Sequence, residues 1–531
     1  LLPGKVRVLE LPVCSEVQAV NIAAAGASGD ALLLLDVSSV FVMRNWLSSL
    51  LNPLVRPEVA CVGPKIINFD KKVMSAGMIA GADGWIANVG TGADWQAPGY
   101  HGRYQCEQNY TLLNSQCLLI KRESFARSGG LDERYAFLVT GVAAFCLHLH
   151  TLGYLAVWSP ESIVATDNTD VSNNARVAEG SALIESYHQL FACDPAYGRH
   201  LSLKMPLYTL DEELTQNSII ASPKGDPVVL IVRAAQSAVA QKAEGYFRAM
   251  QSGGHIRLII KESVPTLTAI LRMNPAITVV NGAVSEEALT TFSRLRGLTG
   301  KPVYALLDES AEPFMSRPSL PFDRWLALTP ALEKWGQSKG LEVLRIPDYV
   351  LQNWMAKETP AAVNDRCRVV CPLFSLTAKE RDVVYQIIEQ TYQSVDWYIF
   401  GECPASWNPL VKATFNYHAN SFSIDTLDAV NPDAVVLFRD NNHQHRFADG
   451  YILLQYAARN ISVICSDFAC FAEYDFATKL KPRLAFWTDA IERLAATREQ
   501  NRQERREMMQ LLSDRYLFDD ARQKALLTML G

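Results

Sequence analysis

Charged side chains follow several apolar segments of strand length in this chain. Asp308 and Glu309 come directly after the run from Val303 to Leu307, and Arg439 follows the run from Ala434 to Phe438. Ligands of open parallel sheets bind outside the carboxyl ends of the strands. These three side chains are therefore predicted to face a bound ligand.

A second basic residue, Arg446, lies a short way along the chain with Phe447 beside it. A guanidinium can hold a diphosphate through two parallel hydrogen bonds, which makes Arg446 the best single candidate for holding a phosphorylated ligand. The sequence leaves a structural alternative open. In that alternative Arg446 pairs with Asp440 or Asp449 and orders its own loop.

The elements that must position these side chains follow from the spacing of apolar residues. Beyond a Pro-rich and Gly-containing linker at 222–227, short apolar runs alternate with helical segments, which predicts doubly wound parallel sheets. We expect two α/β lobes at 228–346 and 347–488. Helices over 489–531 are expected to pack back on the lobes.

The first 221 residues carry a different pattern, clearest between Asn114 and Pro160. It predicts a strand, a glycine-rich turn, a helix and a second strand. These elements are expected at Cys117 to Ile120, Ser128 to Asp132, Ala143 to Leu152 (closed by Gly153), and Tyr154 to Trp158 (stopped by Pro160).

This stretch resembles the acceptor-side half of family-2 glycosyltransferases with the GT-A fold. Further matches to that family include a tail similar to O-antigen-type members. The resemblance implies a GT-A module over residues 1–221. The matching runs are Gly63-Pro64-Lys65-Ile66-Ile67, Ser75-Ala76-Gly77, Pro98-Gly99-Tyr100 with Arg103, and the tail Asp194-Pro195-Ala196-Tyr197.

The acidic positions of the family are not acidic here. The family carries a metal-binding carboxylate at the position of Ser38 and two carboxylates, one of them the general base, at Val142 and Ala144. Its metal-completing His cluster is replaced by a run containing Thr166. A divalent metal neutralises the leaving diphosphate, and a valine cannot accept a proton, so we expect no catalytic residue and no metal in this module.

Asp36 is the acidic residue that remains at the end of the strand from Ala31. It either contacts the nucleotide, as the resemblance implies, or caps the turn that follows. The βαβ unit with which the family begins does not precede it. The sequence leaves open whether that unit is trimmed or lost.

Residues 227–531 resemble family-4 glycosyltransferases of the GT-B fold. Asp308 and Glu309 match the acidic pair after a first-lobe strand, and Gly340 to Pro347 matches the segment that joins the lobes. In the second lobe the family's lysine is missing, and Gln455 stands near the position of its glutamate. The resemblance implies a nucleotide-sugar site between the lobes.

Two tryptophans, Trp85 and Trp95, flank the loop region that shapes the acceptor cleft in active relatives. Exposed aromatic rings suit the apolar faces of sugars. Both residues are candidates for stacking a sugar, and packing within a long loop is the alternative for each.

Composition excludes several other classes of protein. The chain has 531 residues, 49% of them hydrophobic, and a net charge of −6, which gives no basic footprint for nucleic acid. No apolar run reaches the roughly 18 residues of a membrane-spanning helix. The 11 cysteines contain no C-x-x-C pair and indicate buried free thiols of a reducing compartment.

The sequence therefore predicts a glycosyltransferase-like α/β protein of surface-polysaccharide assembly, with a degenerate GT-A module and transfer, at most, by the GT-B module. The alternative is a non-enzymatic scaffold that binds carbohydrate. We expect a nucleotide sugar or a carbohydrate as ligand, no cofactor, and a protein partner or a second copy of the chain. The expected location is the cytoplasm, including the inner face of the membrane.

Overall fold

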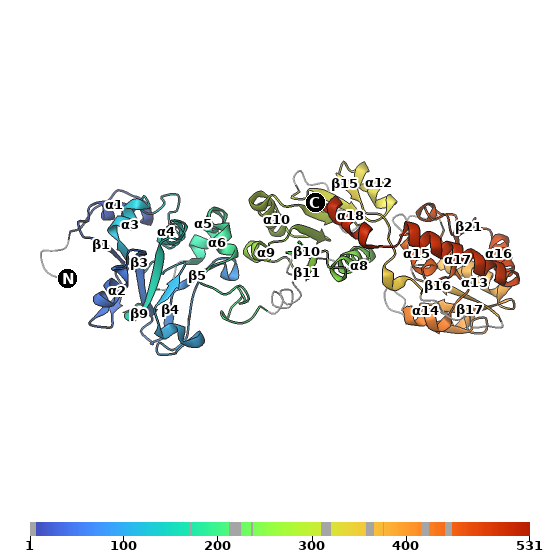
Figure 1. Cartoon of the computed structure of the whole chain (residues 1–531), viewed down its shortest axis with the longest axis horizontal. Helices are drawn as coiled ribbons and strands as arrows, with labels where there is room; N and C mark the ends of the chain where they lie inside the picture. The colour runs from blue at the N-terminus through green and yellow to red at the C-terminus, as the bar shows by residue number, and fades with distance from the viewer. Residues whose placement is uncertain are drawn as a thin grey trace. The chain divides into compact units, whose positions relative to one another are not determined.

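The computed structural model describes residues 7–168, 172–211, 225–234, 237–308, 320–356, 366–374, 376–415, 424–440 and 449–531. The chain divides into two compact units (Figure 1). Unit 1 is Leu1–Ala221 with Pro265–Pro275 and Thr290–Lys301. Unit 2 is Ser222–Val264, Ala276–Leu289 and Pro302–Gly531.

Unit 1 is built on a mixed sheet of seven strands. The strands are β1 (Ala31–Leu35), β2 (Val40–Phe41), β3 (Val59–Ile67), β4 (Val73–Ser75), β7 (Gln108–Tyr110), β8 (Cys117–Lys121) and β9 (Leu155–Ala165). Their order is β1-β8-β3-β9-β2, with β4 beside β3 and β7 beside β9. A separate hairpin joins β5 (Met78–Ala80) to β6 (Ile86–Asn88).

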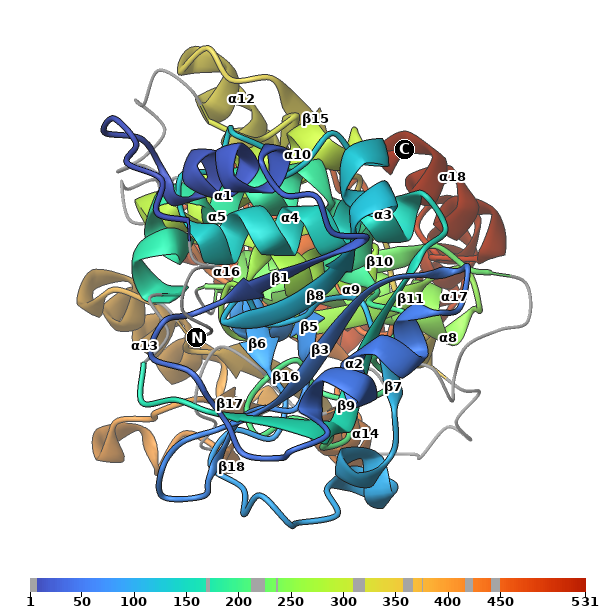
Figure 2. The same ribbon diagram turned by 90° about the vertical axis from the view of Figure 1, so that its left-hand side faces the viewer.

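Helices cover both faces of this sheet, as Figure 2 shows. Successive residues of β3 point to opposite faces: Cys61 packs into the core under α4, and Val62 packs against α2. The long apolar runs of β3 and β8 are therefore explained by burial on both faces. The helices are α1 (Glu16–Ala25), α2 (Trp46–Leu54), α3 (Arg122–Arg127), α4 (Leu138–Thr151), α5 (Ser172–Ser186) and α6 (His188–Ala192).

Helix α4 begins earlier than the predicted start at Ala143. Its first turn has no side-chain cap from the preceding residue. Instead, the backbone N–H of Leu138 donates to the carboxylate of Glu16 at 2.7 Å, and that of Ala136 donates to Glu179 at 2.5 Å. Carboxylates distant in sequence thus satisfy the free N–H groups of the helix end, which no local pattern reveals.

The prediction that Pro160 stops the second strand is wrong. Strand β9 continues to Ala165, because its register with β3 shifts between Ser159 and Ile163. Proline cannot donate a ladder hydrogen bond and is tolerated where the ladder is interrupted. The continuation carries the end of β9 to the position where Thr166 lies.

Unit 2 contains two parallel sheets of six strands each (Figure 1). The first has the order β11-β10-β12-β13-β14-β15, and its strands alternate with helices along the chain, as predicted. The strands are β10 (Val228–Arg233), β11 (Arg257–Lys261), β12 (Ile277–Asn281), β13 (Val303–Leu306), β14 (Arg324–Ala327) and β15 (Val343–Arg345). Of the helices between these strands, α8 (Ala238–Ser252) and α12 (Pro330–Ser338) belong to unit 2. Helix α9 (Leu267–Met273) and all but the first turn of α10 (Glu286–Thr299) belong to unit 1.

The second sheet has the order β18-β17-β16-β19-β20-β21, which is the strand order of a Rossmann fold. Its switch point, where the order reverses, lies between β16 and β19. The strands are β16 (Cys367–Pro372), β17 (Val395–Phe400), β18 (Ala413–Phe415), β19 (Ala434–Leu437), β20 (Ser462–Ser466) and β21 (Thr478–Leu480). The helices are α13 (Ala378–Thr391), α14 (Ile424–Val430), α15 (Tyr451–Ala457) and α16 (Leu484–Ala496).

The two lobes of unit 2 are joined by two stretches of the chain that pair in parallel at one point. Val350 forms a bridge with Leu517, with hydrogen bonds from Val350 N to Tyr516 O and from Phe518 N to Val350 O. The final helices extend from this point: α17 (Arg498–Arg515) packs on the second lobe through Met508 and Leu512. Helix α18 (Asp520–Leu530) packs on the first lobe through Leu526 and Leu530.

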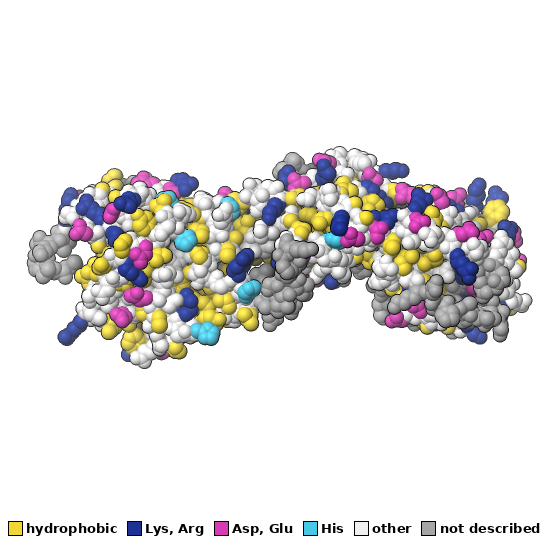
Figure 3. Space-filling view, viewed as in Figure 1, with side chains coloured by type: hydrophobic (Ala, Val, Ile, Leu, Met, Phe, Trp, Pro, Cys, Tyr) yellow, Lys and Arg dark blue, Asp and Glu magenta, His cyan; other side chains and the backbone are white. Residues whose placement is uncertain are grey.

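On the face shown in Figure 3, Lys and Arg side chains are interspersed with Asp and Glu over unit 2. This mixture fits the small net charge of −6. Within the described part of the chain, no helix combines the length and the apolar character that a membrane crossing requires.

Candidate functional site

The end of β1 and the end of β9 meet in unit 1 and bring three side chains together. Ser38 Oγ lies 2.8 Å from Thr166 Oγ1, and the Ser38 hydroxyl also contacts Asp36 Oδ1. The backbone N–H of Asn168 donates to Thr166 Oγ1 at 3.1 Å. If Ser38 donates to the carboxylate, Thr166 must donate to Ser38, so the hydrogen bonds run in one direction from Asn168 to Asp36.

Both carboxylate oxygens of Asp36 thus accept hydrogen bonds from residues of unit 1. Ser38 N donates to Asp36 Oδ1 at 2.8 Å, and Asn168 Nδ2 donates to Oδ2 at 2.9 Å. The Ser38 hydroxyl holds the pKa of the Asp36 carboxyl below its ordinary value, against the opposing effect of partial burial. This geometry matches the turn-capping alternative for Asp36. Among the described residues, no group of three or more His, Cys, Asp or Glu could hold a metal ion.

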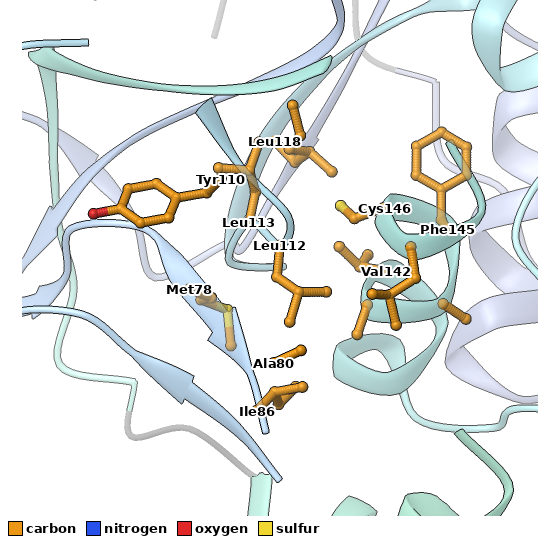
Figure 4. Close-up of a cluster of buried hydrophobic side chains, with 14 of the residues drawn as sticks. Met78, Ala80, Ile86, Tyr110, Leu112, Leu113, Leu118, Val142, Phe145 and Cys146 are labelled. Carbon is orange, nitrogen blue, oxygen red and sulfur yellow. The ribbon is translucent and has the colours of Figure 1, made fainter. Parts of the chain in front are cut away.

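Val142 and Ala144, at the two other neutral positions, lie in the hydrophobic core. Val142 is 0% exposed and Ala144 1% exposed. Figure 4 shows Val142 on α4 among the side chains that pack across to the β5–β6 hairpin, including Met78, Ala80 and Ile86. A proton acceptor at position 142 would be buried in hydrocarbon, so this position serves packing.

The two candidate stacking tryptophans are placed differently. Trp85 is only 3% exposed, contacts Phe191 with a ring-centroid distance of 6.4 Å, and lies within 3.4 Å of where a side chain at Gly180 would start. Its ring faces are therefore covered, which corrects its assignment as an exposed stacking residue. Trp95 is half-buried against Ile67 and Ile163, and its backbone carbonyl accepts a hydrogen bond from Lys65 Nζ.

The strand ends of unit 2 hold Asp308 and Arg439 in different sheets. Asp308 is buried just after β13, and Arg439 follows β19 at the switch point of the second sheet. Arg439 donates from its guanidinium to the backbone carbonyls of Phe438 and Phe374, each at 3.1 Å. Burial lowers the pKa of the Arg439 guanidinium, and the carboxylate of Glu380 opposes that shift.

Glu380, at the start of α13, organises the same switch point and was not predicted. It is 0% exposed and accepts hydrogen bonds from Thr377 N at 2.8 Å and from Asp440 N at 2.6 Å. Lys379 pairs with the carboxylate of Asp440 at 2.9 Å. A local signal for Glu380 exists in the sequence, since Thr377 and Glu380 have the spacing of a capping box.

Three predicted site residues, Glu309, Arg446 and Phe447, lie outside the described residues. The pairing of Arg446 with Asp440 or Asp449 therefore stays a prediction. The described contacts of those two carboxylates include Lys379 for Asp440 and Lys242 for Asp449.

A buried ion cluster joins the lobes of unit 2. Lys242 Nζ on α8 contacts the carboxylate of Asp348 and lies 3.0 Å from Asp449 Oδ2, and it also donates to Leu328 O at 3.1 Å. Lys242 and Asp348 have side-chain exposures of 3% and 5%. Burial raises the pKa of the Asp449 carboxyl above its ordinary value, while Lys242 acts in the opposite direction.

Aromatic groups surround this cluster. Tyr474 donates its hydroxyl to Asp348 Oδ2 at 2.6 Å, and Lys242 Nζ lies 4.8 Å from the ring centroid of Tyr451. The three charged residues are 106 and 207 positions apart along the chain. No local pattern could have predicted that they meet.

The fold and these clusters define a multi-module α/β protein of Rossmann type, with strand-end polar sites in both units. No family model matches the chain. The O-antigen biosynthesis protein RfbC of Myxococcus xanthus is 32% identical over 120 residues, which are 22% of this chain and 9% of that protein. An uncharacterized protein of Sinorhizobium fredii, y4gI, is 32% identical over 140 residues, 26% of this chain and 15% of that protein.

The chain thus spans a small fraction of the length of the curated relatives that it matches. Among solved structures, a glycosyltransferase from Rickettsia africae is similar with a TM-score of 0.44 and 10% identity, over 58% of this chain and 98% of that one. The Anabaena protein HepE with UDP and glucose is similar with a TM-score of 0.39 and 10% identity, over 57% of this chain and 99% of that one.

Proposed function

We propose that this protein works in the assembly of a surface polysaccharide, with unit 1 unable to carry out metal-assisted sugar transfer and unit 2 binding a nucleotide sugar. Any transfer is carried out by unit 2. The likeness to an O-antigen biosynthesis protein supports the pathway. We propose the cytoplasm, including the inner face of the membrane, as its location, and a protein partner or a second copy of the chain as its binding partner.

The observation that carries the proposal for unit 1 is the contact between Ser38 and Thr166. Two neutral hydroxyls at 2.8 Å occupy the place where strand ends β1 and β9 converge. Hard divalent cations need anionic oxygen ligands, and Asp36 alone remains there with its oxygens already accepting hydrogen bonds. This site therefore lacks the ligands to hold a metal ion that would neutralise a leaving diphosphate.

The proposal for unit 2 rests on the switch point between β16 and β19. Ligands of Rossmann sheets bind there, outside the carboxyl ends of the strands. Arg439 lies at this point, and the side chain of Lys379, 81% exposed, stands at the start of α13 beside Asp440. A diphosphate approaching the sheet would meet these two cations, with Asp308, Glu309, Arg446 and Phe447 as the further candidates.

Isothermal titration calorimetry of the full chain with UDP-, GDP-, CDP- and dTDP-sugars, with and without manganese, tests this assignment. We expect binding of at least one nucleotide sugar with an affinity that manganese does not change. Arg439→Ala and Lys379→Ala should each weaken it about tenfold or more, because each removes a charge-assisted contact. Arg483→Ala, at a cation exposed near Phe486, is the matched control and should leave binding unchanged.

A non-enzymatic scaffold is the second candidate. It is favoured by one observation, namely that Arg439 already donates to two backbone carbonyls and so has a structural use. The two functions separate in the calorimetry. If no nucleotide sugar binds, and Arg439→Ala only lowers the melting temperature, the protein is a scaffold.

A further inference from the structure

The loop from Tyr100 to Gln105 in unit 1 holds an arginine without a carboxylate partner. Arg103 lies between two tyrosine rings, at 5.7 Å from the centroid of Tyr110 and 5.8 Å from that of Tyr208. Nearby carboxylates are engaged elsewhere, for example Glu107 with Arg56. Among the described residues no ion pair of Arg103 is present, and its Nε is buried without a hydrogen-bond acceptor.

An aromatic platform stands beside this guanidinium. The ring of Tyr100 stacks on that of Tyr208 with a centroid distance of 4.8 Å and an interplanar angle of 13°. Tyr100 is 39% exposed, so part of its ring remains available to a ligand. Figure 4 shows the hydroxyl of Tyr110 directed away from the hydrophobic cluster, and it lies 3.3 Å from the hydroxyl of Tyr208.

The backbone holds this arrangement in conformations that side chains disfavour. His101 and Tyr208 have φ of 49° and 65°, and for a bulky residue such as Tyr208 a positive φ is an outlier. Gly99 has φ of 68°, and a Cβ there would meet the Tyr104 ring at 2.5 Å. Strained backbone of this kind clusters at ligand sites, where surrounding contacts enforce it.

Lys65 fixes the loop from beneath. It is 6% exposed and donates from Nζ to the carbonyls of Tyr104 at 2.9 Å and Trp95 at 3.2 Å. Tyr197 fixes the other side, because its hydroxyl accepts from Tyr208 N at 2.9 Å. Arg103 and the Tyr100–Tyr208 pair are therefore pre-positioned and lose little conformational entropy when a ligand binds.

We propose that Tyr100, Arg103 and Tyr208 form a binding site for an acidic sugar residue of a glycan. A tyrosine face packs against the C–H surface of a sugar ring. The Arg103 guanidinium hydrogen-bonds the hydroxyls of Tyr110 and Tyr208. Its five N–H donors leave others that can recognise a carboxylate or a phosphate with two parallel hydrogen bonds. A neutral sugar would leave the Arg103 charge unpaired. Binding at this site needs no transfer by either unit, so it stands independently of the proposed function.

The test is calorimetry and saturation-transfer NMR on the full chain with glucuronic acid, a hexose phosphate, neutral glucose and inorganic phosphate. We expect an acidic sugar to bind with a dissociation constant on the order of 1 mM and glucose to bind at least about tenfold more weakly. A preference for the carboxylate or for the phosphate ester tells which acidic group the site takes. Inorganic phosphate binding as well as the hexose phosphate would overturn the role of the tyrosine platform.

Variants then assign the binding to these residues. Arg103→Ala and Arg103→Lys should each lower the affinity for the acidic sugar about tenfold or more, since lysine keeps the charge but not the paired donors. Arg134→Ala is the matched control: Arg134 also lies over a tyrosine ring, at 5.8 Å from Tyr135, but it pairs with Asp132. It should leave affinity unchanged.

Tyr100→Ala keeps the test decisive if substitution of Arg103 impairs folding, because Tyr100 is exposed at the edge of the cluster. It should weaken sugar binding while leaving the melting temperature close to that of the wild type. Wild-type protein that binds no acidic sugar, or Arg103 and Tyr100 variants that retain its affinity, would overturn the proposal.

Discussion

Ser38 Oγ lies 2.8 Å from Thr166 Oγ1, and these two hydroxyls join the ends of strands that are 128 positions apart in the chain. The Ser38 hydroxyl in turn donates a hydrogen bond to the Asp36 carboxylate, which lowers the pKa of that carboxyl. The ends of β1 and β9 in unit 1 thus present a neutral pair of hydrogen-bonded hydroxyls. The hydrogen bonds of Asp36 to Ser38 stabilise the turn that follows β1.

Replacing Ser38 with alanine should raise the pKa of the Asp36 carboxyl, because the largest stabilising contact of its charged form is lost. A carboxyl whose folded pKa is depressed stabilises the fold above its unfolded pKa, and that stabilisation is lost as the pH falls through the folded pKa. The variant should therefore be less stable than the wild type at neutral pH, with the difference vanishing in acid. Urea unfolding across the acid range measures this.

The control for this experiment is Ser48→Ala, which removes an exposed hydroxyl that donates only to the carbonyl of Asn45. Its effect on stability should not depend on pH. An equal loss of stability for Ser38→Ala at acid and neutral pH would contradict the role assigned to the Asp36 carboxylate.

Val142→Asp should destabilise unit 1 more than Val142→Ala. The alanine variant loses two buried methyl groups, which costs about 2 kcal/mol, and leaves a cavity. The aspartate variant places a carboxyl in the same hydrocarbon surroundings, so its folded pKa rises and its stability falls further as the pH increases. Denaturant unfolding at pH values on both sides of the ordinary carboxyl pKa separates the two effects.

A Val142→Asp protein as stable at neutral pH as Val142→Ala would show that this position can accommodate a charge. That result would contradict a purely structural role for residue 142 and would reopen a catalytic use of the site.

Lys242→Met should be strongly destabilising, by about 3–5 kcal/mol, because it leaves the buried carboxylate of Asp348 and the partly buried carboxylate of Asp449 without their cation. The pKa of the Asp449 carboxyl is already raised by burial, so its contribution is present at low pH and is lost as the pH rises. Loss of Lys242 should raise that pKa further and steepen the decline of stability with pH. Thermal unfolding monitored at several pH values measures it.

Lys524→Met provides the comparison for an exposed ion pair. Lys524 pairs with Asp520 on the surface of α18, with side-chain exposures of 62% and 65%. Its loss should change stability by less than about 1 kcal/mol. Similar effects for Lys242→Met and Lys524→Met would show that the lobes do not depend on the buried cluster.

Glu380→Ala should loosen the switch point of the second sheet. The side chain caps α13 through Thr377 and holds the backbone of Asp440, and both of these donors would be left without an acceptor. We expect a loss of about 2–4 kcal/mol from two unpaired, partly buried donors and weaker nucleotide-sugar binding at Arg439. Hydrogen exchange at Asp440 N–H, with Glu389→Ala on the exposed face of the same helix as control, reports the local effect.

Several parts of the fold could be read from the sequence because they depend on neighbours along the chain. The apolar runs at 303–307 and 434–438 predicted strands that the structure contains as β13 and β19. Apolar periodicity reports which faces of an element are buried, and that property is local. The absence of a carboxylate at positions 38 and 142 could also be seen in the sequence, because the chemical type of a side chain does not depend on the fold.

Only the tertiary structure decided which of these side chains meet. The start of α4 is capped by Glu16 and Glu179, and Pro160 is absorbed by a register shift that only the partner strand β3 defines. The cluster of Lys242 with Asp348 and Asp449, and the packing of Arg103 between tyrosines of two separate segments, likewise come from long-range contacts. The interaction of two charges or two rings depends on the distance between them in space. A short segment of the sequence carries no information about that distance when the partners are far apart along the chain.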